Sequence, residues 1–106
     1  MRVLIDECVP RRLISIFAEY EAMSVPYMGW SGKKNGELLR LMTEAKFDVF
    51  VTVDQNLQYQ QNLQSTNISI LVLHAETNSY NDLLSLAPAI HATLLKLKPS
   101  TIYVIK

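Results

Sequence analysis

Carboxylates follow two apolar segments of this chain, and another carboxylate opens a third segment. The run RVLI continues into Asp6 and Glu7, DVFVTV continues into Asp54, and Glu37 follows GWSGKKNG. Carboxylates held close together repel one another, so a site that gathers them usually also holds a divalent cation or a basic side chain. Hard oxygen ligands suit Mg²⁺ or Mn²⁺, which can orient and activate water for attack on a phosphodiester. These residue types therefore indicate a candidate metal-dependent hydrolytic site.

The acids meet only if the segments that carry them lie side by side. Apolar and β-branched runs predict strands at 3–5, 22–30, 47–53, 68–74 and 101–105. Patterns with helical spacing lie between them, at 11–20, 35–45, 55–64 and 81–97. Pro10 suits the start of the first helix, Asn35 is the predicted N-cap of the second, and Pro88 interrupts the last.

Strands that alternate with helices predict an α/β fold, here one domain over residues 1–106. The sheet is expected to be mostly parallel, with about five strands, helices on both faces and right-handed crossovers. DVFVTV is so rich in apolar residues that both its faces must be covered, which makes it the predicted central strand. Ligands of such sheets bind beyond the carboxyl ends of the strands, which places Asp6, Glu37 and Asp54 at one edge.

Each acid also has a purely structural interpretation. Asp6 and Asp54 are suited to accept backbone N–H groups where a helix starts, a common role for aspartate after a strand. Glu37 is suited to complement the dipole of its helix, because acids are favourable in a first turn. Glu7 either assists its neighbour or points away from it. The sequence leaves both interpretations open for all four residues.

Basic and amide side chains near the predicted edge are candidates for substrate contacts. Arginines in a first helical turn oppose the helix dipole, which indicates a phosphate or carboxylate partner, although solvated charge is the commoner outcome. Amides donate and accept hydrogen bonds without adding charge, and a histidine at a strand end can act as an acid or base. Cys8 is expected to be a small buried residue. The candidates are Arg11, Arg12, Lys33, Lys34, Gln55 and His74, with Asn56 beside the acids.

Composition narrows the classes of function. Ten basic and ten acidic residues give a net charge of zero, so a nucleic-acid contact must depend on a local patch or a metal. A single cysteine excludes an internal disulfide, and no apolar run approaches the roughly 20 residues of a membrane span. The strand-like start shows no leader pattern. A cytoplasmic protein without a membrane segment is expected.

Acids after the first and third strands are also typical of the response-regulator receiver, a phosphoacceptor domain. In that arrangement Asp6 and Glu7 would bind Mg²⁺ and Asp54 would accept the phosphoryl group. Receivers also carry Ser or Thr after the fourth strand and Lys-Pro after the fifth. Here the fourth strand ends in His74, and Lys98-Pro99 precedes the last strand. The receiver interpretation therefore lacks two of its parts.

The blocks VLIDECVPRRL, GWSGKKNGELLRL and DVFVTVDQNLQYQQNL together resemble the small stand-alone PIN-like proteins of bacteria and archaea. The resemblance covers nearly the whole chain and depends on the order and spacing of the blocks. It implies a three-layer α/β/α fold and an acidic pocket for Mg²⁺ or Mn²⁺, with Asp6, Glu37 and Asp54 as metal ligands. Where relatives often have a second aspartate, this chain has Asn56, a neutral and weaker ligand that Glu7 could assist.

The resemblance implies two functions. Many PIN domains are ribonucleases, often toxins paired with an antitoxin, so the first hypothesis is a Mg²⁺- or Mn²⁺-dependent endoribonuclease. The second is a non-catalytic PIN-like module whose pocket is degenerate and which binds a partner protein. A homodimer through the apolar edge TIYVI is a further hypothesis, because exposed strand edges tend to pair.

Overall fold

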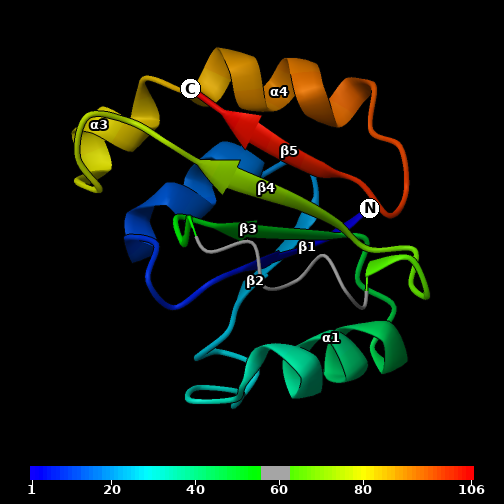
Figure 1. The fold of residues 1–106 in the computed structure, drawn as a ribbon. Helices are drawn as coiled ribbons and strands as arrows, with labels where there is room; N and C mark the ends of the chain where they lie inside the picture. The colour runs from blue at the N-terminus through cyan, green and yellow to red at the C-terminus, as the bar shows by residue number, and fades with distance from the viewer. Residues whose placement is uncertain (56–62) are drawn as a thin grey trace.

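The computed structural model describes residues 1–55 and 63–106 and contains a five-stranded sheet (Figure 1). Its order is β2-β1-β3-β4-β5, and every neighbouring pair is parallel. The predicted α/β class is confirmed, and DVFVTV provides the middle strand. The strands are β1 (Arg2–Ile5), β2 (Glu21–Ser24), β3 (Val49–Thr52), β4 (Ser69–Leu73) and β5 (Ile102–Ile105).

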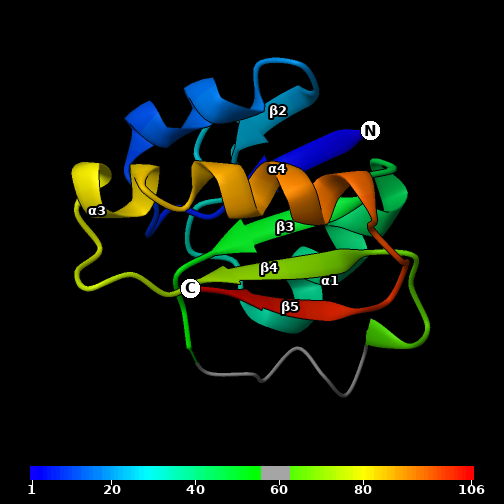
Figure 2. The ribbon, with the colours of Figure 1, turned by 90° about the horizontal axis from the view of Figure 1, so that it is seen from above.

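Helices cover both faces of this sheet, which gives three layers (Figures 1 and 2). Helix α1 (Asn35–Glu44) lies on one face. The 3-10 helix η1 (Arg11–Phe17) and the helices α3 (Tyr80–Leu84) and α4 (Ala87–Leu95) lie on the other. Within residues 1–55 and 63–106, no helix has the length and apolar character that a bilayer crossing requires.

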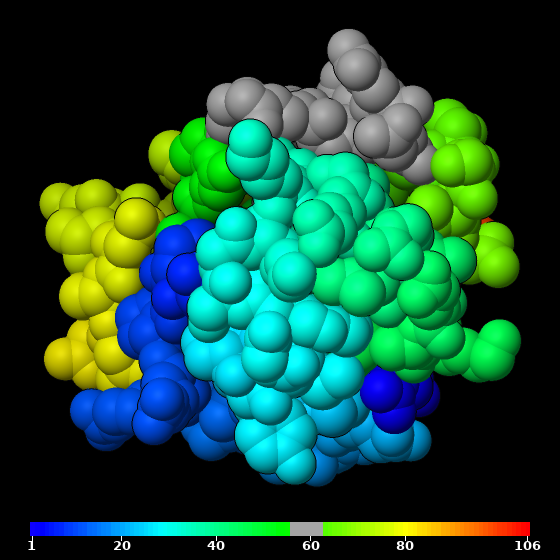
Figure 3. Space-filling view, turned by 90° about the horizontal axis from the view of Figure 1, so that it is seen from below, coloured from blue at the N-terminus to red at the C-terminus, as the bar shows by residue number. Residues whose placement is uncertain are grey.

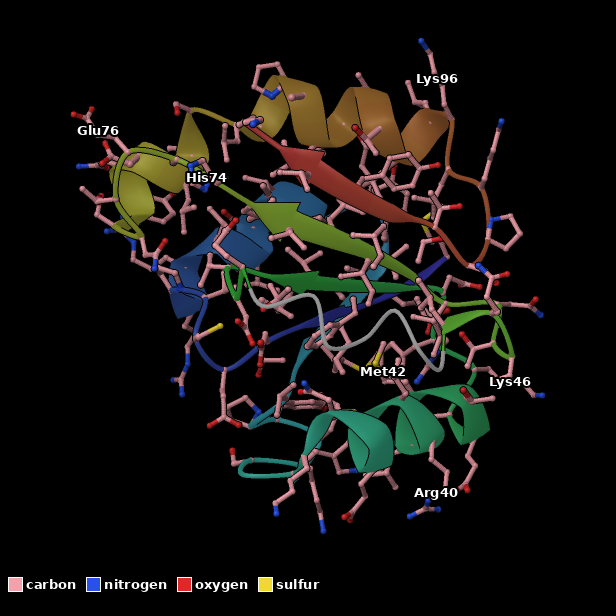
Figure 4. The ribbon with its side chains drawn as sticks, viewed as in Figure 1. Arg40, Met42, Lys46, His74, Glu76 and Lys96 are labelled. Carbon is pink, nitrogen blue, oxygen red and sulfur yellow. The ribbon has the colours of Figure 1, made fainter. Side chains whose placement is uncertain are left out.

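Strand residues alternate between two buried clusters, one on each face of the sheet. Val3 and Ile5 belong to the cluster under η1, α3 and α4, whereas Leu4 and the fully buried Phe50 belong to the cluster under α1. Met42 points from α1 toward the sheet, while Arg40 points away from it (Figure 4). Each large side chain buried in this way contributes about 1.5–3 kcal/mol. The same alternation continues beyond the ends of β1 and β3, so it also decides toward which face of the sheet the next residues of each strand point.

Two predicted helices differ from the structure, the first in its type and its end and the second in its N-cap. Pro10 is followed by a 3-10 helix that ends at Phe17, so the helix is tighter and shorter than the predicted 11–20. Asn35 is the first residue of α1 and not its N-cap, because the carbonyl of Lys34 already accepts the N–H of Leu38 at 2.8 Å. Lys34 provides no side-chain cap.

The predicted helix 81–97 is divided into α3 and α4. Ser85 and Leu86 separate the two helices, and Pro88 lies in the first turn of α4. Proline lacks the N–H that a helix interior needs, but a first turn does not use that group. The polar helix predicted at 55–64 falls largely on residues 56–62, outside the described residues.

Candidate functional site

The strand order creates a crevice between the ends of β1 and β3. The chain leaves β1 for β2 on one side and later returns to form β3 on the other side. Parallel sheets bind ligands beyond the carboxyl ends of the strands at such a switch point. Asp6 continues the ladder here, since its N–H donates to the carbonyl of Val51 at 2.9 Å. The aspartates after both strands therefore lie where this class of fold forms its sites.

An open cleft of about 460 Å³ occupies this position. Asp6, Glu7 and Asp54 line it together with Lys33, so three acidic residues and one basic residue contribute to its wall. Its segments come from distant parts of the sequence, and Figure 3 shows the blue, cyan, green and yellow segments meeting on one face. The structure thus gathers three of the predicted acids, and the cleft also contains the amides of Asn35, Gln55 and Asn78.

Thr52 connects the two aspartates. Its hydroxyl donates to Oδ2 of Asp6 at 2.7 Å and accepts the backbone N–H of Asp54 at 3.0 Å. Thr52 is fully buried, so its end of each hydrogen bond is shielded from water, whereas Asp6 is partly accessible and Asp54 is exposed. Thr52 therefore holds the segments after β1 and β3 in a fixed relative position.

Asp6 both stabilises the turn after β1 and lines the cleft. Its Oδ1 accepts the N–H of Glu7 at 2.8 Å, as expected for an aspartate that stabilises a turn after a strand. Its Oδ2 accepts from Thr52 and from the thiol of Cys8, whose sulfur lies at 3.2 Å. Asp6 is thus fixed on both oxygens while it lines the cleft.

The two glutamates differ in position. Glu7 Oε2 accepts the N–H of Gly32 at 3.0 Å and so ties the loop before α1 to the end of β1. Gly32 has a φ of 80°, a conformation that glycine adopts without strain. Glu37 lies in the first turn of α1 as predicted, but it does not line the cleft, and its carboxylate pairs with Lys33 Nζ at 3.0 Å. Lys33 is therefore shared between Glu37 and the cleft.

The other predicted substrate contacts divide into two groups. Lys33 and Gln55 line the cleft, although Gln55 Nε2 donates to the carbonyls of Val53 at 3.1 Å and Leu73 at 3.2 Å. The side-chain amide of Gln55 thus joins the ends of β3 and β4, which leaves its carbonyl oxygen for other contacts. Asn56, the predicted weak ligand, lies outside the described residues.

The remaining basic residues lie elsewhere. Arg12 places its guanidinium 4.2 Å from the centre of the Tyr80 ring, a cation–π contact. Arg11 lines a different cleft beside β2, and Lys34 is exposed in front of α1. His74 is exposed beyond the end of β4, on the side where Glu76 lies (Figure 4). None of these four predicted contacts is part of the described lining of the acidic cleft.

The carboxylates of the cleft meet part of what a divalent cation needs from a protein. Among residues 1–55 and 63–106, no three His, Cys, Asp or Glu side chains are grouped closely enough to hold a metal ion. Mg²⁺ commonly uses one or two protein carboxylates and completes its shell with water and substrate phosphate. Asp6 and Asp54 fit that smaller requirement, because both carry carboxylate oxygens and line one open cleft. The residues present therefore suit an open Mg²⁺ or Mn²⁺ site that is completed by water or substrate. They do not suit a closed site in which the protein supplies every ligand.

Cys8 is exposed, which corrects the expectation of a buried residue. Its sulfur nevertheless lies 3.6 Å from the hydroxyl of Thr52 and against Asp6. Although the residue is exposed overall, partial burial of its thiol is the largest effect and raises the pKa of Cys8 above its usual 9.0. The charge and the hydrogen bond of Asp6 raise it further, while the Val53 backbone and Thr52 act in the opposite direction. Cys8 is thus a thiol held protonated beside a carboxylate.

We expect Cys8 to react slowly with iodoacetamide in chelator-treated protein. The thiolate is the reactive form, so a raised pKa lowers the rate at neutral pH and moves the rate increase to higher pH than for an ordinary thiol. Asp6→Asn removes the neighbouring charge, lowers the pKa of Cys8 and should accelerate alkylation. Mass spectrometry across the pH range measures both rates, and the urea-unfolded protein is the control. Faster alkylation of the folded than of the unfolded protein at neutral pH would contradict this prediction.

Sequence reasoning missed Thr52, which connects the two aspartates, and two amides that line the cleft. Thr52 has the same side-chain direction as Phe50, so strand alternation predicts that its hydroxyl lies on the face of α1. Its contact with the segment after β1 follows from the pairing of β1 with β3. That signal was present in VFVTVD, where a hydroxyl interrupts an apolar run. Asn35 and Asn78 had no comparable signal, because their approach depends on how the loops before α1 and after β4 fold.

The chain was compared with protein-family models, with curated proteins and with solved structures, and no match was found in any of the three.

Proposed function

We propose that this chain is a PIN-like, Mg²⁺- or Mn²⁺-dependent endoribonuclease, and that it acts in the cytoplasm. The observation that supports the proposal best is the meeting of Asp6 and Asp54 in one open cleft at the switch point of the sheet. Carboxylates of two neighbouring strands suit a cation that keeps part of its water shell. An antitoxin-like protein partner is part of the same proposal, because the resemblance implies one.

Three residues that line the cleft and two beside it have roles in this proposal. Asp6 and Asp54 would hold the cation, which supplies an activated water molecule and offsets charge on the phosphodiester. Thr52 positions the two aspartates through its pair of hydrogen bonds. Lys33 brings an exposed ammonium group to the cleft, suited to a phosphate oxygen of single-stranded RNA. Glu37 is held beside the cleft by Lys33 and would be released when Lys33 turns to the phosphate.

A second candidate, a non-catalytic module that binds a partner protein, is favoured by a different observation. Glu7, Glu37 and both oxygens of Asp6 already have hydrogen-bond or ion-pair partners within the chain. A degenerate pocket is expected to use its acids internally in this way. Under this candidate the acidic cleft stabilises the ends of β1 and β3 and binds no substrate.

The experiment that separates these candidates is Mn²⁺ calorimetry on chelator-stripped protein, followed by cleavage of a labelled single-stranded RNA in the same samples. Saturable binding together with Mn²⁺-dependent cleavage supports the nuclease. No heat at millimolar Mn²⁺ and no cleavage support the second candidate. A receiver would instead show stable labelling of Asp54 by a small phosphodonor.

Lys33→Gln should change RNA affinity and cation affinity in opposite directions. Loss of one phosphate contact should weaken RNA binding about tenfold and reduce the salt dependence by about one counterion. Removal of a positive charge from an acidic cleft, with Glu37 released, should tighten Mn²⁺ binding. RNA titrations at several salt concentrations, in Ca²⁺ to prevent cleavage, and Mn²⁺ calorimetry give the two affinities.

Lys34→Gln is the matched control, because Lys34 is the adjacent exposed lysine and does not line the cleft. It should leave the Mn²⁺ affinity unchanged and have less effect on RNA. Equal effects of the two substitutions on both affinities would show that only net charge matters and would remove Lys33 from the proposed site.

A further inference from the structure

A second cleft, of about 580 Å³, lies beside β2 and shares no lining residue with the acidic cleft. Helix η1 contributes Arg11 and Ile14, β2 contributes residues 22–24, and the turn after β2 contributes Tyr27. Its volume is within the range of about 300–1,000 Å³ that is usual for ligand pockets. Apolar surface predominates in it, and Tyr27 is 78% exposed. A large exposed aromatic ring beside an apolar cleft indicates a contact surface.

The floor of this cleft is the outer edge of the sheet. β2 is the last strand on its side, and it pairs only with β1. Glu21 N–H donates to Met1 at 3.2 Å and Val25 N–H donates to Ile5 at 2.9 Å, so alternate residues of β2 face β1. In a parallel ladder the residues between them direct their backbone groups the other way. Ala22 and Ser24 therefore face outward along the cleft.

Three backbone groups on this edge have no hydrogen-bond partner in the described part of the chain. They are the N–H and C=O of Ala22 and the N–H of Ser24, whereas the Ser24 carbonyl accepts from Met28 at 3.1 Å. Both residues are partly accessible, so the groups can be reached by another chain. Their spacing of two residues is that of an added strand, which uses alternate backbone positions of the edge that it joins.

Arg11 supplies a charge on the rim of the same cleft. The side chain is exposed and has no ion pair with any residue in 1–55 or 63–106. Arginine has a planar, multiply donating guanidinium that suits a carboxylate, so the rim is complementary to an acidic side chain. The β2 edge thus combines open backbone groups with a groove.

We propose that the β2 edge binds an extended segment of a partner protein, which adds to the sheet as a sixth strand. Its backbone would pair with Ala22 and Ser24, apolar side chains would pack on Ile14 and Tyr27, and an Asp or Glu would meet Arg11. The proposal goes beyond the nuclease and does not depend on it, because the two clefts have no residue in common. It specifies the kind of partner segment that would bind, which is extended and apolar and carries an acidic residue.

The test starts from random twelve-residue peptides displayed on phage and selected on the full chain. The enriched peptides should combine alternating apolar residues with Asp or Glu, and one of them is then synthesised for binding and hydrogen-exchange measurements. Bound peptide should slow exchange of the Ala22 and Ser24 amides at least tenfold, whereas the Met23 amide, which faces β1, should change little. Binding that leaves Ala22 and Ser24 unprotected would overturn the proposal.

Charge reversal provides an independent readout. Arg11→Glu should weaken binding of the acidic peptide at least tenfold and restore it for the same peptide with Lys in place of the acid. Arg12→Glu is the matched control, since Arg12 packs on Tyr80 and lies outside this cleft; it should leave affinity within about twofold. Equal losses in both variants would overturn the proposal, and so would a selection that enriches no peptide. A dimer in sedimentation that protects Ala22 and Ser24 without any peptide would also overturn it, because the occupant would then be a second copy of the chain.

Discussion

Asp54→Asn is expected to reduce Mn²⁺-dependent RNA cleavage by at least about a hundredfold, the usual cost of removing one group that stabilises a reacting charge. Asp54 follows β3, is exposed, and lines the cleft that Asp6 also lines. Asparagine keeps the shape of the side chain but loses its charge, so it is a much weaker cation ligand. Mn²⁺ binding should weaken in parallel. Folding should be preserved, because the substitution removes one of three carboxylates that repel one another in the cleft.

Calorimetry, initial cleavage rates and thermal unfolding of the two proteins measure these effects. Glu76→Gln is the matched control: it also removes one exposed carboxylate near a strand end, but Glu76 does not line the cleft. Its cleavage rate should equal that of the wild type. If Asp54→Asn cleaves as fast as the wild type, Asp54 is not a cation ligand. If it loses stability and keeps its cation affinity, the aspartate has a structural role at the end of β3.

Thr52→Val is expected to lower the free energy of unfolding by about 1–3 kcal/mol. Valine has nearly the same shape, so the core around this fully buried position stays filled. The loss comes from the hydroxyl, which donates to Asp6 Oδ2 at 2.7 Å and accepts the Asp54 N–H at 3.0 Å. Because both aspartates then lose a positioning contact, cation affinity should also fall, by about 10–100-fold, as for other residues that orient metal ligands.

Urea unfolding and Mn²⁺ calorimetry measure both consequences in the same variant. Thr52→Ser is the comparison, because it keeps the hydroxyl and removes only a methyl group. It should retain most of the cation affinity even if its stability is reduced. A Thr52→Val protein with wild-type stability and cation affinity would mean that the hydroxyl does not position the aspartates.

Four of the five strands could be predicted closely from the chain because they depend on local composition. The second, predicted at 22–30, is shorter: β2 ends at Ser24, whose carbonyl accepts the N–H of Met28 in a turn. Residues 49–52 are all buried, and a β-branched, apolar run of this kind has no stable position except between two covered faces. Helix α1 was equally clear from its apolar positions, of which Leu38, Leu39 and Met42 are buried. The helix ends were less predictable. Pro10 fixes one backbone angle, but whether an α-helix or a 3-10 helix follows depends on how η1 packs on α3 and β2.

The candidate site was predicted in part. Strand alternation and the rule for parallel sheets were enough to bring Asp6 and Asp54 to one cleft. They were not enough for Glu37, whose side chain pairs with Lys33 one helical turn away, nor for Cys8, which is exposed. Long, exposed side chains have several nearby partners of similar energy, so their direction is decided by small differences that sequence does not reveal.

By itself, the sequence determined the class of fold, the middle strand and the edge at which the acids gather, because these follow from apolar periodicity and from the geometry of parallel sheets. Tertiary structure alone decided the order β2-β1-β3-β4-β5, which places β1 beside β3 and leaves β2 at an open edge. It also decided that Thr52 links Asp6 to Asp54, a contact between residues 46 positions apart. Contacts at such separation depend on how every intervening element packs, which no local pattern of residues encodes.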